Sequence, residues 1–488
     1  MTTLSQVFRP RLGMLTDLHQ LTMANGYFRT GVADHEASFS LFFRENPFGG
    51  AYVIASGLDD VLDLIQHFGF DDEDLAYLAR LRGSDGQPLL DRDFLASLGR
   101  LKLGCDVLAV PEGTVVFAHE PMIRVTGPLL QVQLLETALL NLTGFASLVA
   151  TKASRVCAAA AGRPVLEFGL RRAQGVMGGL TASRAAYLGG CAATSNLLAG
   201  RLYGIPVRGT HAHSWVMAFD SELDAFLAYA SAMPNDCLFL VDTYDTLAGV
   251  RHAIEVGKML REHGQELVGI RLDSGDLGEL SRQARGLLNQ AGFEQALIVA
   301  SSDLDEHRIA EFERRGAVID VWGVGTQLTT AYDQPALGQV FKLTAIREPG
   351  GRWQHKIKLS ETDAKSSQPG LLQVRRFRLG RQFVGDVIYD SPVPPGAGCT
   401  IADPVDSSNR RVIPEATAHD DLLVPVVRSG RRIYDSPSLD DIRARVRREL
   451  AGLFGEGVSL HASGSYPVGL DQSLAELKSH LIREASRA

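Results

Sequence analysis

Short apolar runs that end in polar residues recur through the middle of the chain, and they constrain its fold more than any other feature. Successive run ends lie roughly 30 residues apart, the length that a strand, a loop and a returning helix need. Segments 246–263 and 279–291 are the expected helices between them. This rhythm predicts parallel strands buried on both faces, whose polar ends gather at one end of a barrel. The run ends are Glu167, Thr210, Asp242, Asp273, Asp303 and Gly325.

The predicted fold class is therefore α/β, with an irregular parallel α/β barrel as the catalytic domain over residues 161–346. Residues 1–160 are predicted to form an N-terminal α+β sandwich domain, because apolar runs alternate with turn signals between positions 105 and 132. Residues 347–488 contain polar, turn-rich interruptions and are predicted to form a small C-terminal region that packs on the other domains.

Composition narrows the class of function. Asp and Glu (57) outnumber Lys and Arg (49), which gives a net charge of −8 and disfavours a broad nucleic-acid surface. The first residues hold no apolar core of a secretion signal, and the apolar stretch 129–150 is interrupted by polar residues, as in a buried helix. The five cysteines are scattered without zinc-binding spacing. A cytoplasmic enzyme with reduced thiols and no membrane segment is expected.

The polar residues at the run ends predict phosphate and sugar chemistry. Arginines beside small, Gly-rich turns suit phosphate oxygens, and carboxylates at the same end can bind sugar hydroxyls or Mg²⁺ on a diphosphate. A P-loop is absent from the sequence, and 323–327 lacks the third glycine of a dinucleotide turn. The candidate residues are Arg171, Arg172, Thr210, His211, His213, Asp242, Asp245, Arg271, Asp273, Asp276, Ser302, Asp303 and Thr326.

Several of these residues allow more than one interpretation. His211 and His213 lie two apart on an expected strand, hence on one face, where they could ligate a metal, serve the structure, or supply one chemically active imidazole. The last option is favoured. Asp242 and Asp245 could instead cap the following helix. Lys152 and Arg155 are interpreted as solvated or ion-paired helix residues, with a phosphate role as the alternative.

Five sequence motifs, in order, resemble the nicotinate phosphoribosyltransferase family. Similarity runs from about residue 13 to 345, with further similarity towards the C-terminus. The motifs are Thr16–Ala24 (TDLHQLTMA), Phe42–Gly50 (FFRENPFGG), Glu167–Gly175 (EFGLRRAQG), Gly209–Trp215 (GTHAHSW) and Arg271–Asp276 (RLDSGD).

The resemblance implies a type II phosphoribosyltransferase fold and a homodimer with shared active sites. It implies that nicotinate and phosphoribosyl pyrophosphate give nicotinate mononucleotide and pyrophosphate, the first step of NAD salvage from nicotinic acid. It also implies coupling to ATP hydrolysis through a phosphohistidine, with Mg²⁺ carried by the substrate diphosphate.

Site roles follow from the same resemblance. His213 takes the phosphate from ATP and Asp245 orients it. Phe168 stacks on the pyridine ring, and Arg271 with Thr210 lies near the nicotinate carboxylate. The remaining implied contacts are Arg171 and the partner subunit's Arg44 with phosphates, Asp273, Ser302 and Asp303 with ribose hydroxyls or hydrated Mg²⁺, and Gly325 with Thr326 at the 5′-phosphate.

Two positions depart from the family pattern, and a third separates related enzymes. His19 stands where a tyrosine is usual on the second face of the pyridine, and His211 fills a variable position of its motif. Asn196 stands where the nicotinamide enzyme tends to have an aspartate. The alternatives are a nicotinamide or quinolinate phosphoribosyltransferase, a non-catalytic relative of the fold, and a metal-dependent hydrolase that uses both histidines.

Overall fold

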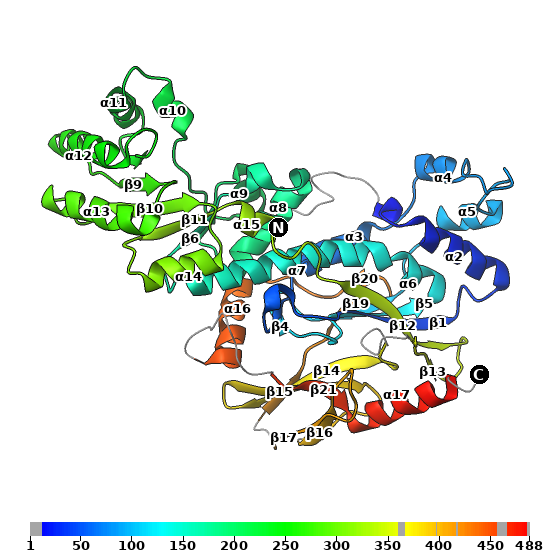
Figure 1. The fold of residues 1–488 in the computed structure, drawn as a ribbon. Helices are drawn as coiled ribbons and strands as arrows, with labels where there is room; N and C mark the ends of the chain where they lie inside the picture. Colours follow the sequence, from blue (N-terminus) through cyan, green and yellow to red (C-terminus); the bar gives the residue numbers. More distant parts are fainter. Residues whose placement is uncertain (1–11, 360–366, 397, 416–417, 456–465, 486–488) are drawn as a thin grey trace. The chain divides into compact units, whose positions relative to one another are not determined.

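The computed structural model describes residues 12–359, 367–396, 398–415, 418–455 and 466–485 (Figure 1). The chain divides into two compact units. One consists of Met1–Leu148 with Ala336–Ala488, and the other of Val149–Pro335. Each unit is described by itself.

The unit Val149–Pro335 is built on a six-stranded parallel sheet of order β7-β6-β11-β10-β9-β8. Its strands are short and largely buried, as the apolar runs predict. The predicted mixed α/β class with a parallel sheet is confirmed. The strands are β6 (Val165–Glu167), β7 (Ala193–Thr194), β8 (Leu238–Leu240), β9 (Gly269–Leu272), β10 (Leu297–Ser302) and β11 (Val321–Val324).

Helices return the chain between these strands, and several begin at an acidic or amide residue whose side chain accepts a backbone N–H. Asp245 caps α12, Asp276 caps α13 and Asp305 caps α14. Figure 1 shows α12 and α13 beside β9 and β10. The helices are α8 (Gly175–Gly189), α9 (Leu197–Tyr203), α10 (His213–Met217), α11 (Glu222–Ala232), α12 (Thr246–Glu262), α13 (Leu277–Gln290), α14 (Glu306–Arg314) and α15 (Thr326–Thr329).

The strand expected at 207–213 is not formed. Val207 makes one isolated parallel bridge with Thr194, and His213 begins α10. The apolar run here is too short to pair along its length, and His211 turns into an aromatic cluster instead of continuing a ladder. The prediction that His211 and His213 share one strand face is therefore wrong.

The other unit contains two larger sheets. The first has the order β13-β12-β1-β5-β3-β19-β20 with antiparallel neighbours, so strands from both ends of the chain share it. Its strands are β1 (Glu36–Phe43), β3 (Asp106–Ala109), β5 (Ile123–Pro128), β12 (Gln339–Arg347), β13 (Gln354–His355), β19 (Val424–Arg428) and β20 (Arg431–Arg432).

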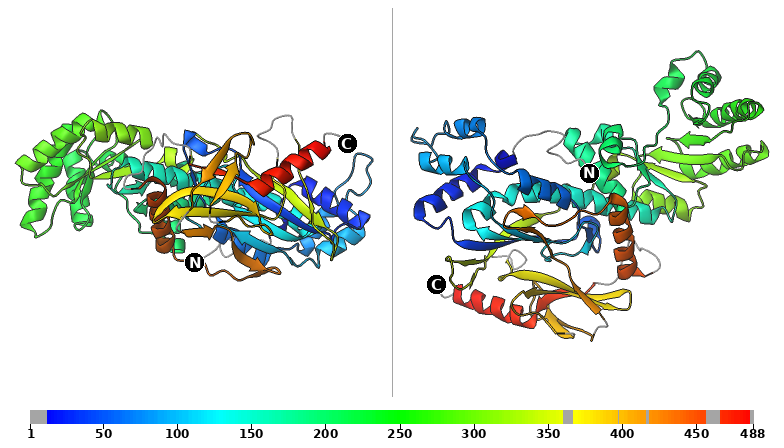
Figure 2. Two further views of the ribbon diagram at one scale, coloured as in Figure 1. Left: turned by 90° about the horizontal axis from the view of Figure 1, so that it is seen from below. Right: turned by 180° about the vertical axis from the view of Figure 1, so that it is seen from behind.

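The second sheet has the order β17-β16-β21-β15-β14-β18. In Figure 2 the helix α17, in red, lies along this sheet, in agreement with its contacts to β15, β16 and β21. A two-stranded sheet pairs β2 (Val53–Ile54) with β4 (Val115–Val116). The strands of the six-stranded sheet are β14 (Leu372–Leu379), β15 (Gln382–Asp390), β16 (Cys399–Ala402), β17 (Arg410–Ile413), β18 (Ala418–Asp421) and β21 (Val468–Asp471).

The apolar stretch 129–150 is helical, as its pattern predicts, and most of its apolar side chains are buried. Within the described ranges, none of the helices combines the length and the apolar character that crossing a membrane requires. The helices outside the parallel-sheet unit are α2 (Leu18–Thr30), α3 (Leu58–His67), α4 (Asp72–Leu78), α5 (Arg92–Leu98), α6 (Leu129–Leu134), α7 (Glu136–Ala159, which continues into it), α16 (Leu439–Phe454) and α17 (Gln472–Ala485).

A fully buried arginine joins three parts of the two-sheet unit. Arg376 on β14 donates to Asp386 on β15 at 2.5 Å and to Glu449 on α16 at 2.6 Å. Its guanidinium also donates to the backbone oxygen of Val115 at 2.8 Å, and Tyr466 donates to Asp386 at 2.7 Å. Burial lowers the pKa of Arg376, but the attraction and hydrogen bonds of Asp386, together with Tyr466 and Glu449, outweigh burial and raise the pKa above its ordinary value. Removing the cation would leave buried carboxylates without compensation.

We expect Arg376→Met to lower the free energy of unfolding by about 3–5 kcal/mol, the usual cost of breaking a buried ion pair from one side. Arg378→Met, on the same strand, is the matched control. Arg378 pairs with Asp420 at 2.9 Å in a partly exposed position, so its loss should cost less than about 1 kcal/mol. Urea unfolding of the two variants measures the difference, and equal losses would contradict the special role of the buried arginine.

Candidate functional site

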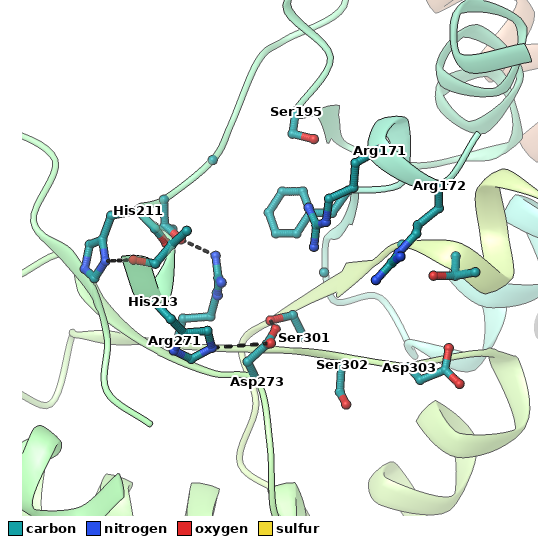
Figure 3. Close-up of a pocket in the computed structure, with 17 residues that line it drawn as sticks. Arg171, Arg172, Ser195, His211, His213, Arg271, Asp273, Ser301, Ser302 and Asp303 are labelled. Atoms are coloured by element: carbon teal, nitrogen blue, oxygen red, sulfur yellow. Dashed lines mark hydrogen bonds and ion pairs between the residues drawn. The ribbon is translucent and has the colours of Figure 1, made fainter. Parts of the chain in front are cut away.

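An open cavity of about 620 Å³ lies at the carboxyl ends of the parallel strands, entirely within the unit Val149–Pro335 (Figure 3). This is the edge of the sheet where the sequence predicts polar residues to gather. The cavity is lined by Phe168, Arg171, Arg172, Ser195, Gly209, Thr210, His211, Ala212, His213, Arg271, Asp273, Ser301, Ser302, Asp303, Gly323, Gly325 and Thr326.

The end of β9 supplies a partly buried cation. Arg271 donates from Nη1 to the hydroxyl of Thr210, and its buried Nε has no hydrogen-bond partner among the described residues. Burial lowers the pKa of Arg271, while Asp273 and Asp242 act in the opposite direction. Arginine nevertheless keeps its charge in proteins. A guanidinium placed in this way, with donor capacity to spare, can bind a carboxylate of a ligand.

A buried carboxylate fixes the turn that follows Arg271. Asp242, at the end of β8, accepts hydrogen bonds from the backbone N–H of Asp273 at 2.8 Å and from the hydroxyl of Ser274 at 2.6 Å. Asp273 in turn accepts from Ser301 on β10 at 2.5 Å. Asp242 is therefore no helix cap. Asp242 instead holds Asp273 in the lining of the cavity, where the Oδ2 atom of Asp273 is 3.8 Å from Nε2 of His213.

His213 is the accessible imidazole of the cavity. It lies at the start of α10, with 39% of its side chain exposed. Its Nδ1 is 3.1 Å from the hydroxyl of Thr243, and its Nε2 is 3.8 Å from Asp273. Figure 3 shows the ring between Arg271 and Asp273. An exposed imidazole beside a carboxylate can act as a nucleophile or a base.

Asp245, the predicted partner of His213, has a different contact in the structure. Its carboxylate accepts from the backbone N–H of Ala248 at 2.7 Å and so caps α12. The contacts of the imidazole are with Thr243 and Asp273 instead. Orientation of His213 by Asp245 stays a prediction, whereas Asp273 and Thr243 are the groups that the geometry offers.

His211 is placed quite differently from His213. It is buried against Phe226, Tyr229 and Phe239, and its Nε2 accepts the backbone N–H of Leu240 at 3.2 Å. Burial lowers the pKa of His211 to about 4. This neutral imidazole holds the 207–213 segment against β8. It is not available to share a metal ion with His213, since its Nε2 already accepts a backbone hydrogen bond.

Phe168 forms one wall of the cavity and packs against a glycine. A methyl group at Gly323 would lie 2.8 Å from two ring carbons of Phe168, so only glycine leaves the ring in place. The preceding residue, Glu167, is buried and accepts hydrogen bonds from Ser183 at 2.9 Å and Thr194 at 2.6 Å. The aromatic wall is thus held from behind by a buried polar network.

A further part of the cavity, here called its anion-binding end, is formed by Arg171, Arg172, Ser302 and Asp303. Arg171 and Arg172, from the 3₁₀ helix η3 (Leu170–Arg172), point into the same space that Ser302 and Asp303 border (Figure 3). The backbone of Ser302 has φ of +154°, a sparsely populated conformation of the kind found at ligand sites. Two guanidinium groups beside hydroxyls and one carboxylate match a sugar phosphate.

Most of the predicted site residues therefore lie together, and six do not line the cavity. Two of these are Asp242, which holds the turn after β9, and Asp276, which caps α13. Asn196 is buried and caps α9, and its amide donates to Ser183 at 3.1 Å. Asp245 caps α12. His19 on α2 and Arg44 after β1 belong to the other unit, so the cavity does not contain them. The residues brought together are Phe168, Arg171, Thr210, His213, Arg271, Asp273, Ser302, Asp303, Gly325 and Thr326.

Sequence reasoning missed Ser195, Ser301 and Gly323 as lining residues. Ser301 directly precedes two predicted residues at the end of β10, so its position alone could have indicated it. Ser195 follows β7, which has two residues and is too short to give a periodic signal. Gly323 is a lining residue because Phe168 packs on it, a contact between distant residues.

The chain is similar to nicotinate phosphoribosyltransferases along nearly its whole length. Profiles described as the nicotinate phosphoribosyltransferase N-terminal domain, family and C-terminal domain match residues 14–143, 165–364 and 374–478. A protein of that name from Bacillus subtilis (strain 168) is 41% identical over 480 residues, which is 97% of this chain and 96% of the relative. One from Mycobacterium tuberculosis (strain H37Rv) is 43% identical, covering 96% and 94%.

Solved structures agree with the sequence comparison. The crystal structure of human nicotinic acid phosphoribosyltransferase is 34% identical and matches with a TM-score of 0.84, covering 96% of this chain and 99% of the human chain. A nicotinate-nucleotide pyrophosphorylase from Pyrococcus furiosus matches with a TM-score of 0.68 at 20% identity, covering 91% and 96%. The second similarity concerns the fold alone.

The buried state of His211 predicts a pH-dependent stability. The unfolded chain takes up a proton on this imidazole near pH 6.5, whereas the folded chain does so near pH 4. The contribution of neutral His211 is therefore complete above pH 6.5 and is lost as the pH falls towards 4. We expect His211→Gln, whose amide oxygen can still accept from Leu240, to flatten the pH dependence of the free energy of unfolding in this window.

The control for that experiment is His263→Gln, at the exposed end of α12. This variant should follow the wild-type curve. Urea unfolding at several pH values between 4 and 8 provides the measurement. The assignment fails if His211→Gln keeps the full wild-type slope below pH 6.5.

Proposed function

The chain belongs to the nicotinate phosphoribosyltransferase family, and we propose that it transfers a phosphoribosyl group from phosphoribosyl pyrophosphate to nicotinate. The observation that carries this proposal is one cavity lined by an aromatic side chain, by an arginine that can bind a carboxylate, and by further arginines, hydroxyls and a carboxylate that suit a sugar phosphate. The products would be nicotinate mononucleotide and pyrophosphate. This is the entry of nicotinic acid into NAD salvage.

The pyridine ring would lie against Phe168, with its carboxylate directed to Arg271 and Thr210. The Nε of Arg271, which has no partner among the described residues, fits such a ligand. This placement would present the ring nitrogen to the ribose. The ring would be covered by one aromatic side chain of this unit, and His19 is proposed for its other face.

Phosphoribosyl pyrophosphate would occupy the anion-binding end. We place the 5′-phosphate at Gly325 and Thr326 and the ribose hydroxyls at Asp303 and Asp273, with Ser302 between them. Arg171, together with the partner subunit's Arg44, would contact the diphosphate. The carboxylates of Asp273 and Asp303 also suit hydrated Mg²⁺, which when bound to the diphosphate would neutralise charge that develops on the leaving group.

Transfer needs no protein nucleophile. The bond between ribose C1 and the diphosphate oxygen breaks, the pyridine nitrogen forms the new bond to C1, and pyrophosphate leaves. The ribose is cationic in character at the transition state. The side chains of the cavity supply position and charge, which are the main sources of catalysis in such a reaction.

We further propose that ATP use passes through His213. The imidazole nitrogen would attack the γ-phosphorus of ATP, ADP would leave, and water would later cleave the phosphohistidine to release phosphate. Asp273 and Thr243 contact this ring and could fix its orientation, and Asp245 is the partner that the family resemblance implies. A phosphate here would add about two negative charges beside the diphosphate site, so it must act through Mg²⁺ and rearranged contacts.

We propose that the parallel strands close into an irregular barrel and that the three regions 1–160, 161–346 and 347–488 act as domains. We propose a cytoplasmic homodimer in which His19 and Arg44 complete the active site of the partner. The exposed apolar side chains of Leu197 and Met217, close in sequence to cavity residues, are compatible with such an interface.

The first functional prediction concerns the pyridine substrate. We expect nicotinate to be used better than nicotinamide by about 10- to 150-fold, because a charge-assisted hydrogen bond to Arg271 is worth roughly 1.5–3 kcal/mol. Arg271→Gln should remove most of this preference. Arg172→Gln, at the anion-binding end, should reduce activity and keep the preference.

The assay combines the protein with phosphoribosyl pyrophosphate and Mg²⁺, and with nicotinate, nicotinamide or quinolinate in turn, in the presence and absence of ATP. Equal turnover of nicotinate and nicotinamide by the wild-type chain would exclude the proposed specificity. Turnover of quinolinate alone would favour a quinolinate phosphoribosyltransferase. Turnover of none of the three would favour a non-catalytic relative of the fold or a hydrolase.

The second functional prediction is that His213 and not His211 accepts the phosphate of ATP. His213→Ala should abolish ATP hydrolysis and the gain in transfer that ATP gives, since both need the phosphoenzyme. Slow transfer without ATP should survive, because other groups position the substrates. His211→Gln keeps a buried acceptor for Leu240 and should keep the coupling.

Labelling with γ-labelled ATP, followed by alkaline work-up that preserves phosphohistidine, reads the site directly. Label on His211→Gln and none on His213→Ala is the expected result. The reverse pattern would show that the wrong histidine has been assigned.

A further inference from the structure

A fully buried lysine pairs with carboxylates on two segments that lead away from the anion-binding end of the cavity. Lys152, on α7, has 1% of its side chain exposed. Its ammonium group is 2.7 Å from Glu306 and 2.8 Å from Asp333. Burying a charged lysine is costly unless it is paired, so two carboxylate contacts at one ammonium group point to a specific role.

The two carboxylates belong to the segments that carry the proposed phosphate and ribose contacts. Glu306 is the first residue of α14, three residues after Asp303. Asp333 follows α15, the helix that begins at Thr326. Lys152 therefore joins the β10–α14 connection, with Ser302 and Asp303, to the segment around α15, with Gly325 and Thr326.

A second contact ties the same two segments on the cavity side. Gln327, on α15, donates to the carboxylate of Asp303 at 3.1 Å. The two segments are thus joined both by the partly exposed amide of Gln327 and by the buried ammonium group of Lys152. The strands β10 and β11 pair as far as Ser302 and Val324, so removing the contact of Lys152 would loosen the connections that follow the paired strands.

The adjacent Arg155 offers a natural comparison. It is also buried on α7, and its Nε donates to the other oxygen of Glu306 at 2.7 Å. Burial alone would raise the pKa of Glu306, but Lys152 and Arg155 together hold it below its ordinary value. Arg155 contacts Glu306, whereas Lys152 contacts both Glu306 and Asp333.

We propose that Lys152 is a positioning residue for phosphoribosyl pyrophosphate, because it sets the spacing between the Ser302–Asp303 and Gly325–Thr326 segments by bridging Glu306 and Asp333. The inference rests on the proposed function for the identity of the ligand. The bridge itself rests on the contacts of Lys152. The pyridine end of the cavity is held separately: Arg271 lies at the end of β9, and Phe168 donates to Val324, which the pairing of β10 with β11 keeps in place.

The kinetic test compares Lys152→Met, Asp333→Asn and Arg155→Met. In Lys152→Met and Asp333→Asn the KM for phosphoribosyl pyrophosphate should rise about tenfold, since sub-ångström misplacement of binding groups weakens several contacts together. The KM for nicotinate should change by less than about twofold. Arg155→Met should lose stability in urea unfolding but keep the wild-type ratio of the two KM values.

Asp333→Asn keeps the test decisive if Lys152→Met fails to fold, because Asp333 is 40% exposed and its substitution leaves Glu306 paired with both cations. An unchanged KM ratio in the folded variants would overturn the proposal. So would an equal rise in Arg155→Met, which would indicate a general effect of packing around Glu306.

A measurement without ligand separates this inference from the proposed function. Amide hydrogen exchange in segments 302–305 and 325–333 should become about tenfold faster in Asp333→Asn and Lys152→Met than in the wild type. Arg155→Met should leave segment 325–333 at the wild-type rate. If the wild-type chain has no transferase activity but the two variants exchange faster, the bridge is supported and the proposed function is excluded. If the wild-type chain is active but the variants exchange at the wild-type rate, the bridge alone is excluded.

Discussion

The cavity depends on carboxylates that tie neighbouring strand ends together. Asp242 at the end of β8 accepts from the turn after β9, and Asp273 in that turn accepts from Ser301 on β10. At the opposite edge of the sheet, Glu167 joins β6 to β7 by accepting a hydrogen bond from Thr194. Parallel strands alone would place polar residues at one edge. These contacts decide which side chains turn towards the ligand and which serve as supports.

The same supports explain why two histidines two positions apart have different roles. His211 accepts from Leu240 and is buried among aromatic rings, and burial lowers its pKa to about 4, so it is neutral at physiological pH. Its fixed position places His213 at the start of α10, beside Asp273. The buried imidazole thus shapes the segment, and the exposed one has the freedom and the neighbours that phosphate chemistry requires.

The sequence predicted the parallel sheet and most of the cavity, because both follow from periodicity along the chain. A polar residue after an apolar run lies at the strand end whatever the rest of the fold does. Side-chain partners could not be predicted in this way. Asp245 was predicted to contact His213 but caps α12. Asp273, in the turn after β9, lies beside the imidazole instead. The strand predicted at 207–213 was wrong for a related reason, since its aromatic surroundings come from α11 and β8.

Asn196 shows how a structural contact changes the argument for specificity. The family resemblance implies that this position separates the nicotinamide enzyme from its relatives, because an aspartate there can accept a hydrogen bond from an amide. In the structure the Asn196 side chain caps α9 and donates to Ser183, which itself donates to Glu167 behind Phe168. Its amide is therefore occupied by the network that holds the aromatic wall. Under the proposed function, recognition of the pyridine substituent would then fall to Arg271 and Thr210, and an aspartate at position 196 would alter the support of Phe168 as well as the charge near the ring.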